Sequence, residues 1–392
     1  MKKTVWVLGI LLGLLTQDKA FGARYVEGEA LVLFQKPSGG RVTAASVERG
    51  SESFRLASLA ARSKARVTKA YGALSEAGDG IFALLRSDMR TTAQLLEDLR
   101  ARPDVLATSP NRIVRALRTP NDEGYSRLWG LGAIRAPEAW DVTTGSAAVY
   151  VAVVDTGVSS SHPDLRENLA TTFCRDFTQS PTGYRDGNGH GTHVAGTIGA
   201  VGNNGLGVAG VNWTTRLIAL KILGDNGTGS SELTVEALEY LTRLLRSDPS
   251  MRIAAVNLSL GGYAPDTPEQ MQANDAEWRA YKILDRQNRV VIVVAAGNEG
   301  LEVGKPAPHD AEKDEDGNYL YKKGYYGYPA SYLGLDNLIV VGAAASDGAA
   351  AVFSNWSPTA VHLTAPGVRI LSTIPLRDGT LYAWMSGTSM AA

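Results

Sequence analysis

The chain has 392 residues, of which 44% are hydrophobic and 20% charged, and its formal net charge is −1. This length predicts two domains, and the composition excludes both a disordered chain and a strongly basic nucleic-acid binder. The single cysteine, Cys174, excludes an internal disulfide, and we expect it to be a buried, apolar, unreactive group.

The N-terminus has the pattern of an export signal. Met1-Lys2-Lys3 precedes an apolar run from Val5 to Leu15, and Ala20-Phe21-Gly22 places small residues where a signal peptidase reads the chain. This pattern predicts a signal peptide over residues 1–22, cleaved after Gly22, that is too short to span a membrane. A buried N-terminal strand is the alternative. We therefore expect a secreted protein without a membrane anchor.

Residues 24–118 have the pattern of a small α+β unit. A Thr-x-x-Gln capping box at Thr91 opens its second helix, and Val47, Phe54 and Leu59 are the expected apolar positions of the first. The order β-α-β-β-α-β is the ferredoxin-like arrangement. The expected strands are Glu29–Phe34, Arg66–Ala70, Ile81–Leu85 and Val105–Ala107, and the expected helices are Ala44–Ala61 and Thr91–Arg100.

The two parts of the chain differ in charge. Residues 24–118 carry 16 Lys and Arg against 10 Asp and Glu, whereas residues 119–392 carry 20 against 29. A basic segment followed by an acidic one predicts two parts that attract each other rather than a nucleic-acid binder. Arg112–Asp122, polar and basic with Pro120 near its end, is the expected linker.

From Val149 onward, apolar runs alternate with helical patterns. Near-continuous apolar strands are typical of a parallel sheet that is covered on both faces, so we expect a three-layer, doubly wound α/β fold. Catalytic residues belong at the carboxyl ends of such strands. The expected strands are Val149–Val154, Leu217–Leu223, Ile253–Leu258, Val290–Ala295 and Leu338–Val341, and the expected helices are His190–Gly199, Leu233–Leu245 and one after Pro268 that includes Tyr281 and Leu284.

Three stretches carry candidate catalytic residues. They are Asp155-Thr156-Gly157, then Gly187 to His193, and finally Ser386 to Ala392. A serine hydroxyl is a poor nucleophile until a base takes its proton and a third group orients that base. Each stretch alone also fits a turn or a strand end, but the three together, in the order Asp, His, Ser, resemble the subtilisin family of serine proteases.

The resemblance implies a role for each of these residues. His190 would be the general base that takes the proton of Ser389, and Asp155 would hold the imidazole. Asn298, in Ala295-Ala296-Gly297-Asn298, matches the family's oxyanion asparagine, with the Ser389 backbone N–H as second donor. Loss of that side chain costs ~3 kcal/mol of barrier in subtilisin itself. A turn residue is the alternative for Asn298, and we expect His193 to be structural.

The resemblance also implies polypeptide substrates and a structural Ca²⁺. An extended substrate would pair with Gly227-Thr228-Gly229 on one side and Ser259-Leu260-Gly261-Gly262 on the other, although either stretch alone fits a loop. The loop from Gly202 to Val208 resembles a subtilisin calcium loop, and a metal-free turn is the alternative. The ligands implied are Asp164, Gly202, Asn204, Leu206 and Val208. Asp310–Asn318 is either a second cation site or a solvated loop.

In the family, the equivalent of residues 23–118 is a propeptide that aids folding and inhibits the enzyme. The resemblance thus implies that the chain cuts itself between about Arg115 and Asp122, releasing a monomeric catalytic domain over residues 119–392. The sequence departs from the family pattern in two places. The segment between Asn298 and Tyr328 is longer than in the family, and the family's helix continues well beyond Ala392, so we expect a catalytic domain that is incomplete at its C-terminus.

These observations predict a secreted serine endopeptidase that is made as an inhibited precursor. A non-catalytic, subtilase-like binding or inhibitory module is the alternative because of the early end. An esterase of the α/β-hydrolase type would need a Gly-x-Ser-x-Gly elbow and the order Ser, acid, His, which the sequence does not have.

Overall fold

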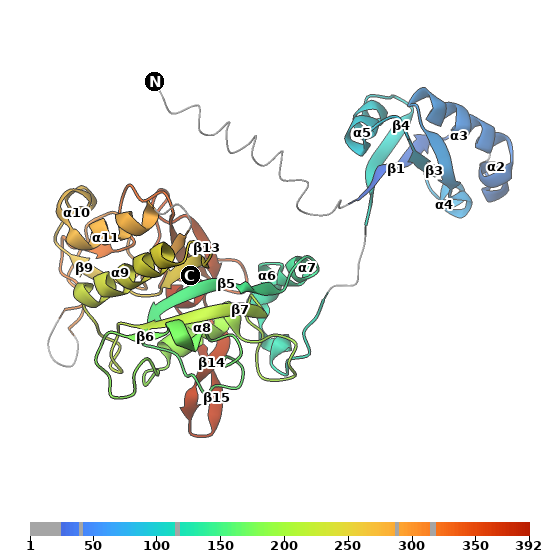
Figure 1. Ribbon diagram of the computed structural model, residues 1–392. Helices are drawn as coiled ribbons and strands as arrows, with labels where there is room; N and C mark the ends of the chain where they lie inside the picture. Colours follow the sequence, from blue (N-terminus) through green and yellow to red (C-terminus); the bar gives the residue numbers. More distant parts are fainter. Residues whose placement is uncertain (1–24, 39–41, 114–117, 287–289, 314–318) are drawn as a thin grey trace. The chain divides into compact units, whose positions relative to one another are not determined.

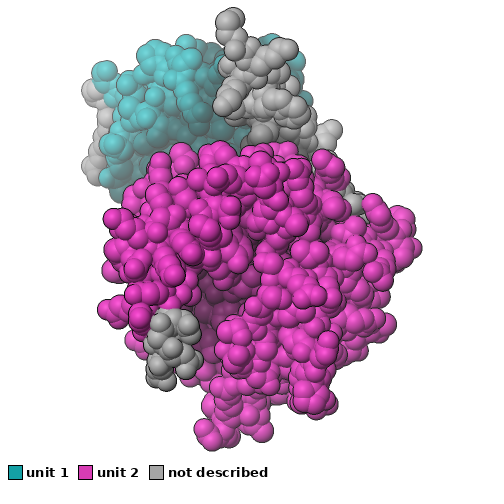
Figure 2. Space-filling model, turned by 90° about the vertical axis from the view of Figure 1, so that its left-hand side faces the viewer, with its two compact units in different colours: residues 1–116 teal, residues 117–392 magenta. Residues whose placement is uncertain are grey.

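The computed structural model describes residues 25–38, 42–113, 118–286, 290–313 and 319–392 (Figure 1). The chain divides into two compact units, residues 1–116 and 117–392, drawn in teal and magenta in Figure 2. The predicted signal peptide, residues 1–22, lies outside the described residues.

Unit 1 is an antiparallel sheet with helices, in the strand order β2-β3-β1-β4. The predicted ferredoxin-like arrangement is confirmed, because each predicted strand is present and the first strand lies between the third and the fourth. The elements are β1 (Tyr25–Gln35), α2 (Ala44–Arg49), α3 (Ser51–Arg62), β2 (Arg66–Ala70), α4 (Gly72–Ala77), β3 (Gly80–Arg86), α5 (Thr92–Arg100) and β4 (Val105–Arg112).

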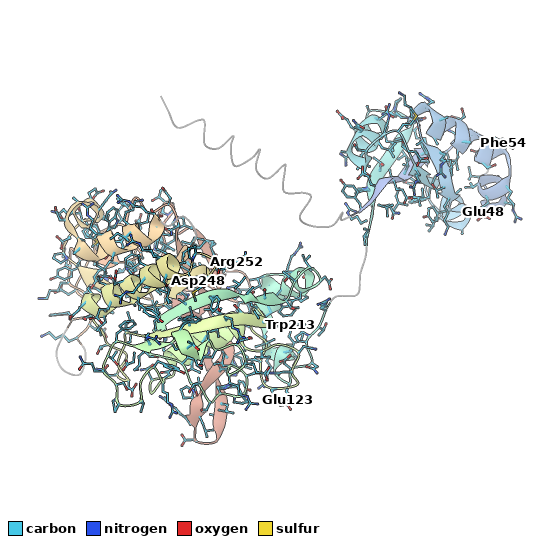
Figure 3. The ribbon with its side chains drawn as sticks, in the orientation of Figure 1. Glu48, Phe54, Glu123, Trp213, Asp248 and Arg252 are labelled. Carbon is cyan, nitrogen blue, oxygen red and sulfur yellow. The ribbon has the colours of Figure 1, made fainter. Side chains whose placement is uncertain are left out.

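The first helix of unit 1 differs from its prediction. Instead of one helix over Ala44–Ala61 there are two, because Gly50 takes an extended conformation with φ −109° and ψ −153°. The break resets the helical phase, so Leu56 and Ala60 face the core, whereas Phe54 is 79% exposed (Figure 3). The prediction of one continuous helix over Ala44–Ala61 is therefore wrong, and the short helix α4 was not predicted.

Unit 2 contains a seven-stranded sheet in which every neighbouring pair is parallel. In its order, β13-β12-β10-β8-β5-β7-β6, the strands β8, β10, β12 and β13 follow one another on one side of β5, and β7 and β6 lie on the other side, as in a doubly wound fold. The strands are β5 (Gly145–Asp155), β6 (Arg175–Asp176), β7 (Thr214–Lys221), β8 (Arg252–Leu258), β10 (Val291–Ala295), β12 (Leu338–Ala344) and β13 (Leu363–Pro366).

Helices cover both faces of this sheet. Along β5, Ala152 and Val154 join the core cluster that contains α9 and α11, while Val153 between them joins the cluster that contains α8. Since successive strand residues point to opposite faces, the sheet is buried on both sides, and the predicted three-layer α/β fold is confirmed. The helices are α8 (His190–Gly199), α9 (Ser231–Ser247), α10 (Pro268–Asn274), α11 (Ala276–Asp285) and α12 (Thr388–Ala391).

Smaller elements complete unit 2. The short antiparallel pairs β9–β11 and β14–β15 were not predicted, because their sequences lack a strong alternating pattern. Trp140 at the end of α7 packs on Trp213, labelled in Figure 3, with ring centroids 4.9 Å apart. Among the described residues no helix is long and apolar enough to span a bilayer. These elements are η2 (Tyr125–Arg127), α6 (Trp129–Ala133), α7 (Ala136–Trp140), η3 (Thr171–Phe173), β9 (Gly262–Ala264), β11 (Tyr326–Tyr328), β14 (Ile370–Arg377) and β15 (Thr380–Met385).

Candidate active site

A carboxylate and an imidazole meet at the carboxyl end of β5. Asp155 is the last residue of this strand and His190 the first of α8. The Nδ1 atom of His190 lies 2.8 Å from Oδ1 and 3.0 Å from Oδ2 of Asp155. Asp155 is fully buried, and its Oδ1 also accepts the Thr156 N–H at 2.7 Å. With Nδ1 donating to the carboxylate, Nε2 of the neutral ring remains as a proton acceptor.

Glycine allows α8 to begin against this carboxylate. A Cβ at Gly191 would lie 2.3 Å from the Gly157 carbonyl oxygen and 3.0 Å from the Asp155 Cβ, closer than van der Waals contact permits. Gly189, the N-cap of α8, has φ 111°, which side-chain-bearing residues rarely adopt. The run Gly-His-Gly is therefore what brings the imidazole onto Asp155.

The pKa of His190 lies above its ordinary value. Burial works against the charged ring, but the negative charge of Asp155, its hydrogen bond and the charge of Asp186 together outweigh that effect. Asp186 lies in the preceding loop, where it accepts the Thr156 hydroxyl at 2.9 Å and the Thr192 hydroxyl at 2.6 Å. The sequence analysis did not identify Asp186, because its effect on His190 depends on hydrogen bonds to Thr156 and Thr192, which lie before and after it in the chain.

Ser389 lies in the first turn of α12 and is 9% exposed. Its hydroxyl donates to the Ser259 carbonyl at 3.2 Å, and the Ser259 hydroxyl donates to the Ser389 carbonyl at 2.9 Å. Within the described residues no hydrogen bond joins Ser389 to His190, so the structure has one of the two predicted links, between Asp155 and His190. A staggered rotation about χ1 redirects a serine hydroxyl, and catalytic hydrogen bonds tighten when substrate binds.

Asn298 follows β10 and faces the same space as Ser389. Its Oδ1 accepts the Thr388 N–H at 2.8 Å and the Thr388 hydroxyl at 3.1 Å. These two bonds fix the amide and orient its NH₂ group as a donor. Asn298 and Ser389 both line a cavity of about 170 Å³, so the two residues border one volume.

The predicted substrate segments form the walls of a larger neighbouring cavity. Gly227–Gly229 and Ser259–Gly262 both line this space of about 510 Å³, and His190 lies at its edge. Ser259–Gly262 also borders the cavity of Ser389. Tyr328, at the end of the long segment after Asn298, contributes to both cavities. The structure thus brings the sequence-predicted segments together around two cavities with a shared wall, which we call the groove.

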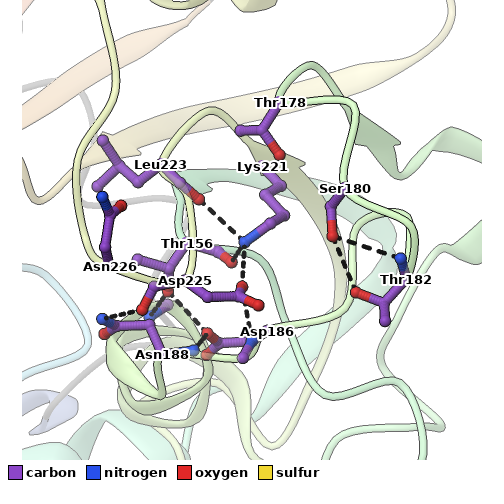
Figure 4. Close-up of polar contacts among 12 residues, drawn as sticks. Thr156, Thr178, Ser180, Thr182, Asp186, Asn188, Lys221, Leu223, Asp225 and Asn226 are labelled. Atoms are coloured by element: carbon purple, nitrogen blue, oxygen red, sulfur yellow. Dashed lines mark hydrogen bonds and ion pairs between the residues drawn. The ribbon is translucent and has the colours of Figure 1, made fainter.

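A buried lysine supports the Asp155 end of the site (Figure 4). Lys221, the last residue of β7, is fully buried. Its Nζ donates to the carbonyl oxygens of Thr156 and Leu223 at 2.6 and 2.9 Å and to Asp225 Oδ1 at 2.9 Å. Asp225 also accepts the Gly187 N–H at 3.2 Å. Lys221 therefore connects the loop before His190 to the chain after Asp155, a role that the sequence did not reveal.

The residues of the predicted calcium loop also lie together. Asp164 is fully buried; its Oδ1 accepts from the Asn204 amide at 2.8 Å and its Oδ2 from the Val208 N–H at 2.9 Å. Asp122, missed from the sequence, accepts the Asn203 N–H at 2.6 Å, while its buried Oδ1 has no partner among the described residues. Burial raises the pKa of both carboxyl groups. Two buried acids and an orphaned oxygen fit a hard cation.

Two further predictions can be compared with the structure. His193 is fully buried; its Nε2 donates to the carbonyls of Ile370 and Ala383, and burial lowers its pKa to about 4, so it is a neutral structural residue. Cys174 is a buried free thiol whose pKa burial raises to about 11. The acidic stretch after Asp310 lies partly outside the described residues. Within those described, no group of three His, Cys, Asp or Glu side chains could hold a metal.

A parallel α/β sheet that carries Asp155, His190 and Ser389 in this chain order has the arrangement of the subtilisin-like class of serine peptidases. The Subtilase family model (peptidase S8) matches residues 146–392. The chain therefore belongs to the subtilase family of serine peptidases.

Relatives of this chain carry matching names. It is 35% identical over 76% of its length to the Thermophilic serine proteinase of Bacillus sp. strain AK1 and 34% identical over 70% to Thermitase of Thermoactinomyces vulgaris. The chain spans 63% and 81% of these relatives' own lengths. A solved structure of a cold-adapted subtilisin-like serine proteinase is 26% identical, with a TM-score of 0.43, and the match covers 62% of this chain and 70% of that one.

Proposed function

We propose that this chain is a serine endopeptidase in which Asp155, His190 and Ser389 form the catalytic triad. The observation that carries the proposal is the Asp155–His190 hydrogen bond of 2.8 Å beside the groove that Ser389 lines. A base held by a buried carboxylate, an adjacent hydroxyl and preset amide donors are the components that acyl transfer requires. The non-catalytic alternative gives no reason for the base and the acid to be paired.

The reaction follows from these positions. Ser389 Oγ attacks the carbonyl carbon of a peptide bond while its proton passes to His190 Nε2. The Asn298 amide and the Ser389 N–H donate to the oxygen that becomes negative. The C–N bond then breaks, and the leaving amine takes the proton from Nε2. Water attacks the resulting acyl ester by the same route, which restores the serine and releases the acid.

The test uses a fluorophosphonate probe, which labels only an activated serine. The wild-type chain should be labelled, and Ser389→Ala should abolish labelling. Ser386→Ala is the matched control, because Ser386 is an exposed serine three residues away and should leave labelling intact. Absence of labelling in a folded wild-type chain would refute the proposal.

We further propose that residues 23–118 form an inhibitory propeptide that the enzyme removes between about Arg115 and Asp122. Unit 1 has its own core and therefore suits a separable domain. Its positive charge and the negative charge of residues 119–392 favour their association. Ser389→Ala should leave the precursor uncut, which intact mass and N-terminal sequencing would report.

Secretion is also part of the proposal. The relatives include an Extracellular protease of Xanthomonas campestris, 32% identical, and an Intracellular serine protease of Paenibacillus polymyxa, 37% identical, so membership of the family leaves the compartment open. The signal pattern of residues 1–22 favours export. The uncut Ser389→Ala precursor, recovered from the culture medium with an N-terminus directly after Gly22, would be the direct observation.

Subtilases generally bind structural calcium, and we propose that this chain does so with Asp164 and the loop of residues 202–208. Asp164, Asn204 and the carbonyls of Gly202, Leu206 and Val208 would supply oxygen ligands, and Asp122 would add a second carboxylate. Bound Ca²⁺ would neutralise the two buried acids and stabilise the fold.

A further inference from the structure

The larger cavity of the groove contains an acid that the proposed reaction does not use. Glu277, the second residue of α11, lines the 510 Å³ cavity, which Ser389 does not line, and is only 6% exposed. Its backbone N–H and that of Trp278 are capped by Asp275 Oδ1, at 2.7 and 3.4 Å. This cap fixes the start of α11 and with it the position of the carboxylate.

Glu277 has no cationic partner in the described part of the chain. It forms no ion pair there, and no described lysine or arginine lines the cavity. The groups that face it are acidic or neutral: Asp275 and Tyr281 on its own helix, Ser231 at the start of α9, and Tyr328 and Tyr332 from the segment before β12. An ionised carboxylate buried without a cation is unfavourable, so this site favours the arrival of one.

The remaining cavity wall suits a long cationic side chain. Ile222, Leu223 and Leu260 supply apolar surface to the same cavity as Glu277. Lysine and arginine bury their methylene stems on such surfaces and keep the charged end for a polar partner. Burial raises the pKa of Glu277 to about 7, with Asp275 adding to the rise and Ser231 opposing it. A bound cation would therefore also favour ionisation of the carboxyl group near neutral pH.

The groove also brings a substrate to this acid. Ser259–Gly262 is a wall of both cavities, so a peptide extended along it presents side chains to each. We propose that Glu277 makes the larger cavity a subsite for a lysine or arginine of the substrate, at a position other than the residue held in the Ser389 cavity. This inference rests on the proposed peptidase function and adds a substrate preference to it.

The test compares cleavage of matched peptides by the processed enzyme. One series places lysine, and the other the uncharged isostere norleucine, at each position within about four residues of the cleaved bond. At one position the wild-type kcat/KM should favour lysine by about tenfold or more, the range expected for a desolvated charge pair. Glu277→Gln should reduce this ratio to about one. Glu277→Asp, which keeps the charge, should retain part of the preference.

Glu236→Gln is the matched control, because Glu236 is an exposed acid on α9 and its loss changes the net charge equally. It should leave the lysine-to-norleucine ratio unchanged. Cleavage of the norleucine peptides with no lysine preference at any position would overturn this inference and leave the peptidase function standing. An unchanged preference in Glu277→Gln would do the same. Failure to cleave any peptide would overturn both.

Discussion

Lys221 lies opposite Asp155 in the parallel pairing of β7 with β5, and each is the last residue of its strand. Beyond that point, the buried ammonium of Lys221 binds the carbonyl of Thr156, the residue after Asp155, at 2.6 Å. Through Asp225 the same group reaches Gly187, three residues before His190. The acid and the base of the proposed triad are thus held by one shared cation behind them.

The first prediction concerns this positioning role. Lys221→Met should leave the Thr156 and Leu223 carbonyls without a donor and release the loop before His190. We expect kcat to fall about tenfold or more at temperatures well below unfolding, because small displacements of catalytic groups are costly, with KM less affected. Steady-state kinetics, together with the melting temperature, would measure this.

The matched control is Lys282→Met. Lys282 binds Asp285 at 2.5 Å and the Gly334 carbonyl at 2.7 Å, and it does not line either cavity. Its loss should lower the melting temperature and spare kcat. Equal effects of the two variants on kcat would mean that Lys221 acts on stability alone.

The second prediction is the pH profile. Neutral His190 is the base, so kcat/KM should fall as the pH drops through its raised pKa. Asp155→Asn removes the main groups that raise this pKa and leaves burial, which lowers it. The acid limb of the profile should therefore move to lower pH while kcat falls by about 10⁴, as in other serine peptidase triads. An acid limb at an unchanged pH would contradict the assignment of His190 as the base.

The same raised pKa has a consequence for stability. Charged His190 has Asp155 as its partner only in the folded state, so the pair contributes to the stability of the fold. This contribution is fully present below the pKa of the unfolded chain, about 6.5, and is lost as the pH rises through the higher pKa of the folded state. Asp155→Asn should remove this contribution. Its melting temperature should therefore approach that of the wild type as the pH rises.

The third prediction concerns the proposed Ca²⁺. Chelation with EDTA should lower the melting temperature of the wild-type chain, since a ligand bound only by the folded state stabilises it. Asp122→Asn should reduce that difference, because it removes the carboxylate whose Oδ1 has no partner in the described part of the chain. Asp266→Asn, at an exposed position, serves as the control. An EDTA effect of equal size in Asp122→Asn and wild type would exclude Asp122 as a ligand.

The sequence predicted those parts of the molecule that local patterns determine. Asp155 ends a strand, Asn298 follows one and His190 opens a helix, and the small residues beside them mark these positions. The supporting residues were missed because their partners are distant: Lys221 binds Thr156 across 65 residues, and Asp122 binds Asn203 across 81. The break at Gly50 was missed because the spacing of apolar residues continues across Gly50, whereas the helical conformation of the backbone stops there.

The last prediction tests the buried state of Glu277 independently of any enzymatic activity. Its pKa is raised to about 7 in the folded chain, mainly by burial. Between about pH 4.5 and 7, the folded state therefore holds a proton that the unfolded chain has lost, and stability falls as the pH rises through this window by up to about 3 kcal/mol. A glutamine side chain at this position has no proton to lose, so Glu277→Gln should gain stability relative to wild type as the pH increases.

Thermal unfolding of wild type, Glu277→Gln and Glu236→Gln at about pH 4, 5, 6, 7 and 8, which spans this window, would measure the difference. We expect the melting temperature of Glu277→Gln to rise above that of wild type progressively with pH, and Glu236→Gln to track wild type throughout. The wild-type curve also contains the other titrating groups, which cancel in the comparison of variants. Parallel curves for wild type and Glu277→Gln would mean that this carboxylate ionises freely, because it would then lie in water rather than in the wall of the groove.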